Sequence, residues 1–126
     1  AIDLIHREST DKIIRSFYEV YNQLGYGFLE KVYENALIRE FSENGLEFCN
    51  QKKNIVNYKG SEVGLYVADF EVEKIVIVVV KACECILEEH EFQLINYLKA
   101  ANFEVGLILN FGKKPEFKRK VFTKKN

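Results

Sequence analysis

One apolar run constrains the fold of this chain more than any other feature. Residues 75–80 read IVIVVV, an unbroken series of β-branched side chains, and Lys81 follows directly. β-Branched residues favour strands, and a strand that lacks polar alternation is typical of one covered on both faces. We therefore expect a buried strand at the centre of a sheet, with a lysine carried at its end.

The segment before this run predicts an antiparallel neighbour, because a polar turn at Glu73–Lys74 joins the two. In the expected strand over 62–72, period-two alternation puts Asp69, Glu71 and Glu73 on one face. The residues expected on the opposite face are Ala68, Phe70 and Val72. Charge inside a sheet is costly, so Asp69 and Lys81 mark a candidate site. Two interpretations stay open: a structural ion pair, or a carboxylate that holds a divalent cation beside a lysine that orients water.

Periodicity elsewhere predicts helices on either side of these strands. Apolar residues at helical spacing predict helices over 10–24, 28–44 and 88–102, the first begun by a cap at Ser9 or Thr10. Further strands are expected over 46–58 and 106–110, with a last edge strand over 117–122. The order α-α-β-β-β-α-β, followed by that edge strand, predicts an α/β fold with a mixed sheet flanked by helices. The β-α-β unit that ends at 106–110 should cross over with a right hand.

Length and composition set the outer limits. A chain of 126 residues predicts a single domain over 1–126, with an irregular lead-in over 1–9. The net charge is −1, yet residues 113–126 hold seven lysines and arginines against one acid. This basic segment would either contact phosphates or form a solvated terminus. Three cysteines without a framework spacing indicate reduced thiols and a cytoplasmic protein, and no apolar run predicts a membrane span.

Single residues outside the strands carry weaker signals. Glu30 falls in the first turn of the second helix, where an acid either complements the helix dipole or points into a cleft as a ligand. Gln93 and Tyr97 lie one turn apart on one helix face. Cys83 and Cys85 with His90 lack the paired four-ligand spacing of zinc sites, so we expect no zinc there.

Several parts of the sequence, in order, resemble a known family. Residues 27–33 spell GxxExxY, and they are followed by Asp69, the apolar run that ends at Lys81, the segment HEFQLINYLKA and the segment VGLILNFG. Together, from about Phe17 to Val121, they are similar to the GxxExxY proteins, which are placed in the PD-(D/E)XK nuclease superfamily. The resemblance implies a restriction-endonuclease-like α/β core and hydrolysis of DNA or RNA that depends on Mg²⁺ or Mn²⁺.

The resemblance also implies roles for particular residues. Asp69 matches the metal-binding aspartate, Lys81 the motif lysine, and Glu30 an additional acidic ligand carried by a helix. Gln93 and Tyr97 match a QxxxY pattern that lies near the site and the path of the nucleic acid.

The chain departs from the motif at Val79, where the superfamily has an acid two residues before the lysine. Valine neither binds a metal ion nor accepts a proton, and its apolar side chain would make Lys81 depend on an ion pair with Asp69 or Glu30. Glu71 shares the face of Asp69, but it stands one strand step of ~6.6 Å away. Two hypotheses follow. The chain is a weak Mg²⁺-dependent phosphodiesterase with Asp69 and Glu30 on the metal, or a non-catalytic module that binds nucleic acid or protein without a cofactor.

Overall fold

The computed structural model describes residues 6–123, and the expected α/β architecture is confirmed in that part of the chain. The elements, in order, are α1 (Arg7–Leu24), α2 (Glu30–Glu43), β1 (Phe48–Tyr58), β2 (Ser61–Val72), β3 (Val76–Lys81), α3 (Glu88–Ala101), β4 (Val105–Phe111) and β5 (Pro115–Val121). None of the helices within residues 6–123 is long and apolar enough to cross a membrane.

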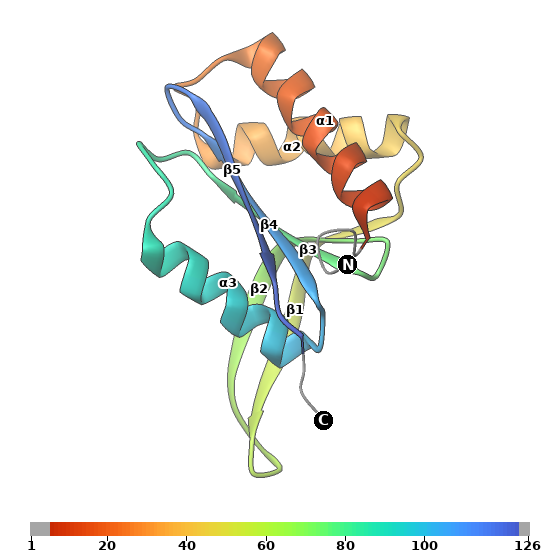
Figure 1. The fold of residues 1–126 in the computed structure, drawn as a ribbon, viewed down its shortest axis with the longest axis vertical. Coiled ribbons are helices and arrows are strands. Elements are labelled where there is room, and N and C mark those ends of the chain that lie inside the picture. Colours follow the sequence, from red (N-terminus) through yellow and green to blue (C-terminus); the bar gives the residue numbers. More distant parts are fainter. Residues whose placement is uncertain (1–5, 124–126) are drawn as a thin grey trace.

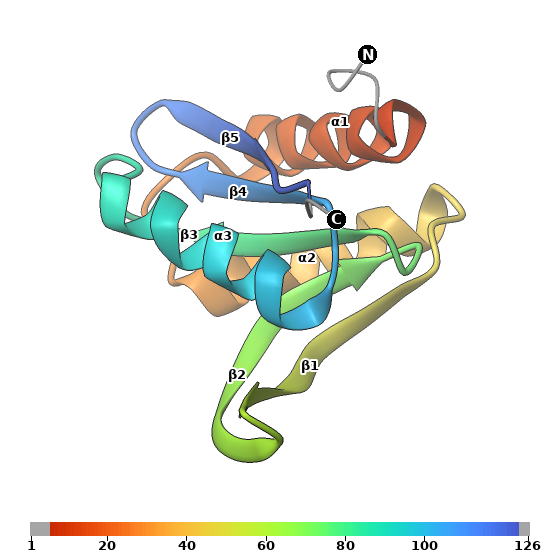
Figure 2. The ribbon, with the colours of Figure 1, turned by 60° about the horizontal axis from the view of Figure 1, so that its bottom comes forward.

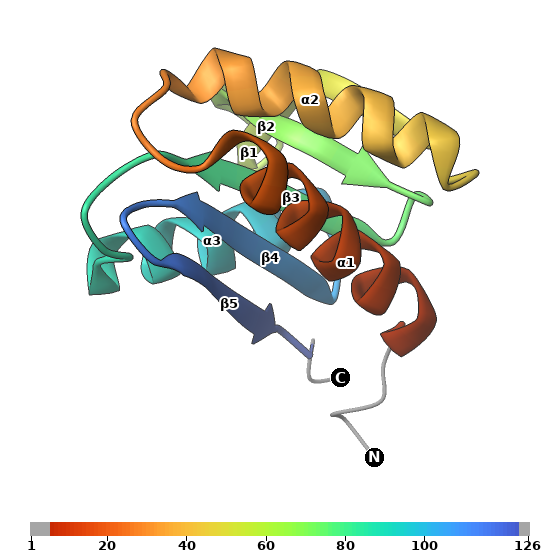
Figure 3. The same ribbon diagram turned by 90° about the horizontal axis from the view of Figure 1, so that it is seen from above.

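The strands form one mixed sheet in the order β1-β2-β3-β4-β5. β3 and β4 are parallel, and the other neighbouring pairs are antiparallel. Helices α1 and α2 cover one face of this sheet and α3 covers the other, as Figure 1 and Figure 3 show. The hairpin of β1 and β2 extends past the body of the molecule, which Figure 2 shows from another side.

Strand β3 is buried on both faces, as its unbroken apolar run predicts. Val76, Val78 and Val80 pack in the core beneath α1 and α2. Ile77 and Val79 pack in the second core, beneath α3. The strand therefore joins the two cores, and only Lys81 at its end is partly exposed.

The alternation expected for β2 is wrong at Ala68. Phe70 packs beneath α1 and α2, whereas Ala68 packs on the α3 side. The pairing of β1 with β2 keeps its register on both sides of Gln51 and Asp69, but these two residues are not paired. Gln51 takes a left-handed backbone conformation with φ of 57°. At this point the β1–β2 pair changes the face that it buries. Every second residue in this part of β2 is still buried, but the buried side chains lie on opposite sides of the sheet before and after Asp69.

The beginnings of α1 and α2 also differ from the expected ones. Helix α1 starts at Arg7, within the expected lead-in, and residues 1–5 lie outside the described part of the chain. Helix α2 starts at Glu30 because residues 25–29 form a loop, in which Gly25 and Gly27 have φ of 68° and 111°.

Half of the expected basic segment, residues 115–121, is a strand rather than a solvated terminus. Residues Pro115–Val121 pair with β4 along their whole length. Lys120 forms an ion pair with Glu91 of α3, which fixes this edge of the sheet to the helix. Lys124 and Lys125 lie outside the described residues.

Candidate functional site

Asp69 lies where β2 separates from β3. The pairing between these strands runs from Val72–Val76 to Phe70–Val78 and then ends. Beyond it, Oδ2 of Asp69 accepts a hydrogen bond of 2.7 Å from the backbone N–H of Val80. The carboxylate thus satisfies a backbone donor that β2 no longer reaches, and it is held in the gap between the two strands.

A second carboxylate, which the sequence analysis did not identify, lies beside Asp69. The side chain of Glu34 is only 6% exposed, and it forms an ion pair of 3.0 Å with Lys31. Asn50 donates a hydrogen bond of 3.2 Å to Glu34 Oε2. The Nε2 group of Gln51 donates both to Glu34 Oε2 and, over 3.2 Å, to Oδ1 of Asp69. An amide NH₂ group therefore bridges the two carboxylates.

The charges around Asp69 are unfavourable to its ionised form. Burial raises the pKa of the Asp69 carboxyl above its usual value, and the negative charges of Glu34 and Glu30 raise it further. The hydrogen bonds from the Val80 N–H and the Gln51 amide act in the opposite direction without cancelling the increase. The site is a crowded group of acids in which one amide separates the two nearest carboxylates.

Glu30 is exposed in the first turn of α2, and its charge acts on both Asp69 and Cys83. Lys81 is half-buried at the end of β3, beside Asn110 of β4 in the sheet register. Burial raises the pKa of the Cys83 thiol, and the charge of Lys81 partly opposes that increase. The structure thus brings Glu30 within electrostatic reach of Asp69, and both Glu30 and Lys81 within reach of Cys83.

The expected ion pair between Lys81 and Asp69 or Glu30 is wrong. Within residues 6–123, Lys81 forms no ion pair with a carboxylate. The carboxylate oxygens of Asp69 already accept hydrogen bonds from uncharged donors. Lys81 stands at a partly exposed strand end, where water stabilises its charge without a partner.

Of the two α3 residues expected near the site, Tyr97 lies near Asp69, whereas Gln93 is exposed to solvent. The ring of Tyr97 stacks on Tyr66, with centroids 4.2 Å apart and planes inclined by 12°. Burial raises the pKa of the Tyr97 phenol, and the charge of Asp69 adds to the effect. Gln93 is exposed one turn earlier and makes no side-chain hydrogen bond in the described part of the chain.

The motif of residues 27–33 has a structural basis in Tyr33. This buried tyrosine donates a hydrogen bond of 2.7 Å to the carbonyl of Gly25 and accepts one of 3.2 Å from the N–H of Phe28. Its ring stacks on Phe111 at the end of β4, with centroids 4.2 Å apart. The motif therefore fixes the loop that leads into Glu30.

A sequence profile of the PD-(D/E)XK nuclease superfamily matches residues 7–120. The chain belongs to the PD-(D/E)XK nuclease superfamily. A solved structure titled "Crystal structure of SSO0001" shares the fold, with a TM-score of 0.58 and 15% identity. That likeness covers 73% of this chain and 50% of the other, so the chain spans about half the length of that structure. The comparison with curated proteins found no match.

Members of the superfamily typically use a divalent metal, and the donor set here does not fit one. Both oxygens of Asp69 accept hydrogen bonds, and Val79, two residues before Lys81, packs beneath α3 and offers no side-chain ligand atom. Within residues 6–123, no group of three or more His, Cys, Asp or Glu side chains is arranged to hold a metal ion. Mg²⁺ and Mn²⁺ require several oxygen ligands, more than this arrangement offers.

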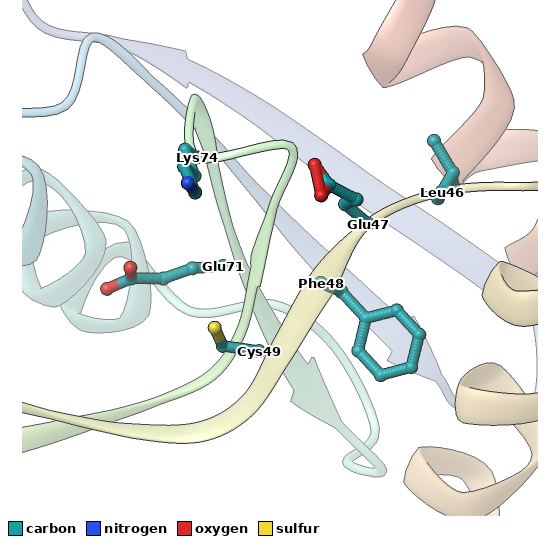
Figure 4. A pocket seen from close by; sticks show the side chains of 6 residues that line it. All are labelled: Leu46, Glu47, Phe48, Cys49, Glu71 and Lys74. Carbon is teal, nitrogen blue, oxygen red and sulfur yellow. The ribbon is translucent and has the colours of Figure 1, made fainter.

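Glu71 does not join Asp69 as a second acid. Its Oε2 accepts a hydrogen bond of 2.9 Å from Asn54. Its side chain lines a separate hollow together with Cys49 and Lys74, near the start of β1 (Figure 4). Glu71 lies two residues after Asp69 on β2, and its side chain makes contacts that Asp69 does not share.

Proposed function

We propose that this chain is a GxxExxY-type member of the superfamily that binds nucleic acid through the end of β3 and does not hydrolyse it efficiently. In this proposal Asp69, Glu30 and Lys81 form the remnant of a hydrolytic site. Gln93 and Tyr97 lie along the path of the bound strand. One observation carries the proposal. Both carboxylate oxygens of Asp69 already accept hydrogen bonds, one from the backbone N–H of Val80 and one from the side-chain amide of Gln51.

The loss of an acid at Val79 explains why hydrolysis is expected to be weak. Hydrolysis of a phosphodiester needs strong stabilisation of developing negative charge, which two-metal and lysine-assisted sites supply. One such electrostatic contact is worth about 3–4 kcal/mol, or a factor of about 10²–10³ in rate. Lys81 remains as a source of positive charge, but no acid two residues earlier on β3 supports it.

Binding does not require the missing acid. Lys81 is a cation without a carboxylate partner among residues 6–123, so it is free to contact a phosphate. Lys113 and Lys114 are exposed in the turn that follows β4, and β4 is the strand next to Lys81. Phosphate contacts from such lysines supply most of the affinity of a protein that binds nucleic acid without sequence preference.

The test is a panel of single- and double-stranded DNA and RNA, assayed for binding and for cleavage with Mg²⁺ or Mn²⁺. We expect binding that weakens as the salt concentration rises, with little or no cleavage. Lys81→Ala should reduce affinity, whereas Lys74→Ala, an exposed lysine in the turn before β3, should not. Efficient cleavage that disappears in Asp69→Asn would overturn the proposal in favour of a metal-dependent phosphodiesterase. Absence of affinity for every nucleic acid would favour a protein-binding module.

A further inference from the structure

A hollow lies at the carboxyl ends of the parallel strands β3 and β4, beside the candidate site. It measures about 510 Å³ and is lined by three segments, residues 26–29, 82–84 and 111–113. The first segment leads into Glu30, and the second follows Lys81 directly. In open α/β sheets, ligands bind in the crevice outside the carboxyl ends of the strands, which is where this hollow lies.

The floor of the hollow is held rigidly by Asn110, a buried polar residue of β4. Its side chain accepts a hydrogen bond from the N–H of Cys83 and donates one to the carbonyl of Cys83, each 2.9 Å long. A Cβ atom on Gly112 would stand 2.5 Å from that same carbonyl oxygen, so only glycine permits this approach of the chain. The hollow is therefore preformed.

Two exposed aromatic rings stand on its wall. Tyr26 is 57% exposed and Phe28 is 48% exposed. The loop that carries them is fixed by Tyr33, whose ring meets Phe28 edge-on, with centroids 6.1 Å apart. Because the loop is fastened, these rings are presented to solvent at little cost in conformational freedom.

The charged side chains that line the hollow are one lysine, Lys113, and one acid, Glu84. Lys113 lines it, and the backbone there is held by Tyr21, whose hydroxyl contacts the carbonyls of Gly112 and Lys113 at 2.9 and 2.7 Å. Lys81 lies immediately before the segment 82–84. Rigid aromatic faces beside lysines are the combination with which proteins bind single-stranded nucleic acid, because bases stack on the rings while lysines contact phosphates.

We propose that this hollow holds an unpaired base stacked on Tyr26 and Phe28, with Lys81 and Lys113 on the neighbouring phosphates. The inference rests on the proposed nucleic-acid binding and adds that the preferred substrate is single-stranded. Bases inside a duplex already stack on their neighbours, so they offer no free face to the two rings. The base occupies the hollow without entering the gap between β2 and β3.

The test compares a fluorescently labelled single strand with a duplex of the same sequence. Tyr26→Ala and Phe28→Ala should each weaken binding of the single strand at least about fivefold, since stacking on one aromatic ring contributes that much or more. Tyr26→Phe should restore the affinity because it keeps the ring. Tyr58→Ala is the matched control, since Tyr58 is 61% exposed on the β1–β2 hairpin, outside the hollow. Duplex binding should be unchanged in all four variants.

The outcomes separate this inference from the function on which it rests. Single-strand affinity that is equal in Tyr26→Ala, Phe28→Ala and Tyr58→Ala would overturn the base-binding hollow and leave nucleic-acid binding in place. Tighter binding of the duplex than of the single strand would do the same. Absence of binding to either probe by the unaltered chain would overturn both. Thermal unfolding of each variant checks that the exposed substitutions leave the fold intact.

Discussion

The carboxylate of Asp69 accepts a hydrogen bond of 2.7 Å from the backbone N–H of Val80. This contact connects β2 and β3 just beyond their last paired residues, Phe70 and Val78. The Asp69 side chain thus replaces the backbone acceptor that a paired strand would supply, at the place where the two strands separate. Asp69 therefore has a structural role in addition to the role proposed for it in the site.

We expect Asp69→Ala to destabilise the fold more than Asp69→Asn. Alanine leaves the Val80 N–H without its acceptor, at a cost of about 1–3 kcal/mol if that group stays buried, while the Gln51 amide keeps its hydrogen bond to Glu34. Asparagine keeps one acceptor oxygen of the same shape. Urea unfolding measures the difference, and hydrogen exchange at the Val80 amide should be faster in the alanine variant. Equal stabilities of the two variants would contradict the structural role.

The raised pKa of Asp69 predicts a pH dependence of stability with a definite sign. The folded state takes up the proton at a higher pH than the unfolded state, whose Asp69 titrates near 3.8. The free energy of unfolding should therefore increase as the pH falls through the raised pKa of Asp69 in the folded state. The increase should be complete once the pH is below the pKa of Asp69 in the unfolded state. Asp69→Asn has no such contribution. The stability of the unaltered chain minus that of Asp69→Asn, measured across this range, should increase as the pH falls, and a decrease would refute the assignment.

The sequence predicted the central strand well because the signal was local. The run 75–80 contains no polar residue, so its burial on both faces needed no knowledge of its neighbours. The reversal of faces between Ala68 and Phe70 was missed for the opposite reason. The reversal coincides with the left-handed backbone of Gln51 on the neighbouring strand, while the burial pattern of β2 keeps its period of two.

The candidate site was only partly predictable from sequence. Glu34 follows the motif tyrosine and has the pattern of an ordinary helix acid, yet β1 supplies Asn50 and Gln51, which make it a buried neighbour of Asp69. No local pattern in residues 48–58 marks these amides as site residues. The roles of Lys81 and Glu30 stay predictions, since proximity and charge alone do not establish chemistry.

Gln51→Glu should convert the bridged carboxylates into three facing acids. We expect a lower unfolding free energy at pH 7, because repulsion replaces two hydrogen bonds from the amide. Mg²⁺ or Ca²⁺ should then raise the unfolding temperature, since a cation relieves that repulsion. Asn57→Asp is the matched control, because it adds one acid at an exposed position of the same strand. Equal responses of the two variants to the cation would show that the effect is not local.

Removing the stacked ring of Tyr97 should lower the pKa of Tyr66. Burial is the main cause that raises the pKa of the Tyr66 phenol to about 12, followed by the charges of Glu71 and Tyr97. Tyr97→Ala exposes the ring of Tyr66 and removes one of these charges, so the phenol should ionise closer to 10. Ultraviolet titration shows the change, with Tyr66→Phe identifying the signal. Tyr58→Ala, which alters an exposed tyrosine of the hairpin, should leave the Tyr66 pKa in place.

Val79→Glu places an acid two residues before Lys81, as the proposed function implies for an ancestral site, and tests whether the site is a degenerate hydrolytic centre. Val79 packs beneath α3, so an uncompensated charge there should cost about 3–5 kcal/mol. Val78→Glu is the matched control, because Val78 is fully buried on the opposite face, beneath α1 and α2. If position 79 retains the geometry of an ancestral site, Mg²⁺ or Mn²⁺ should raise the unfolding temperature of Val79→Glu and leave Val78→Glu unchanged. Cleavage of nucleic acid should then appear in Val79→Glu and disappear when Asp69→Asn is added. If Val79→Glu and Val78→Glu lose equal stability and metal restores none of it in either, Val79 is an ordinary core residue and not a former site position.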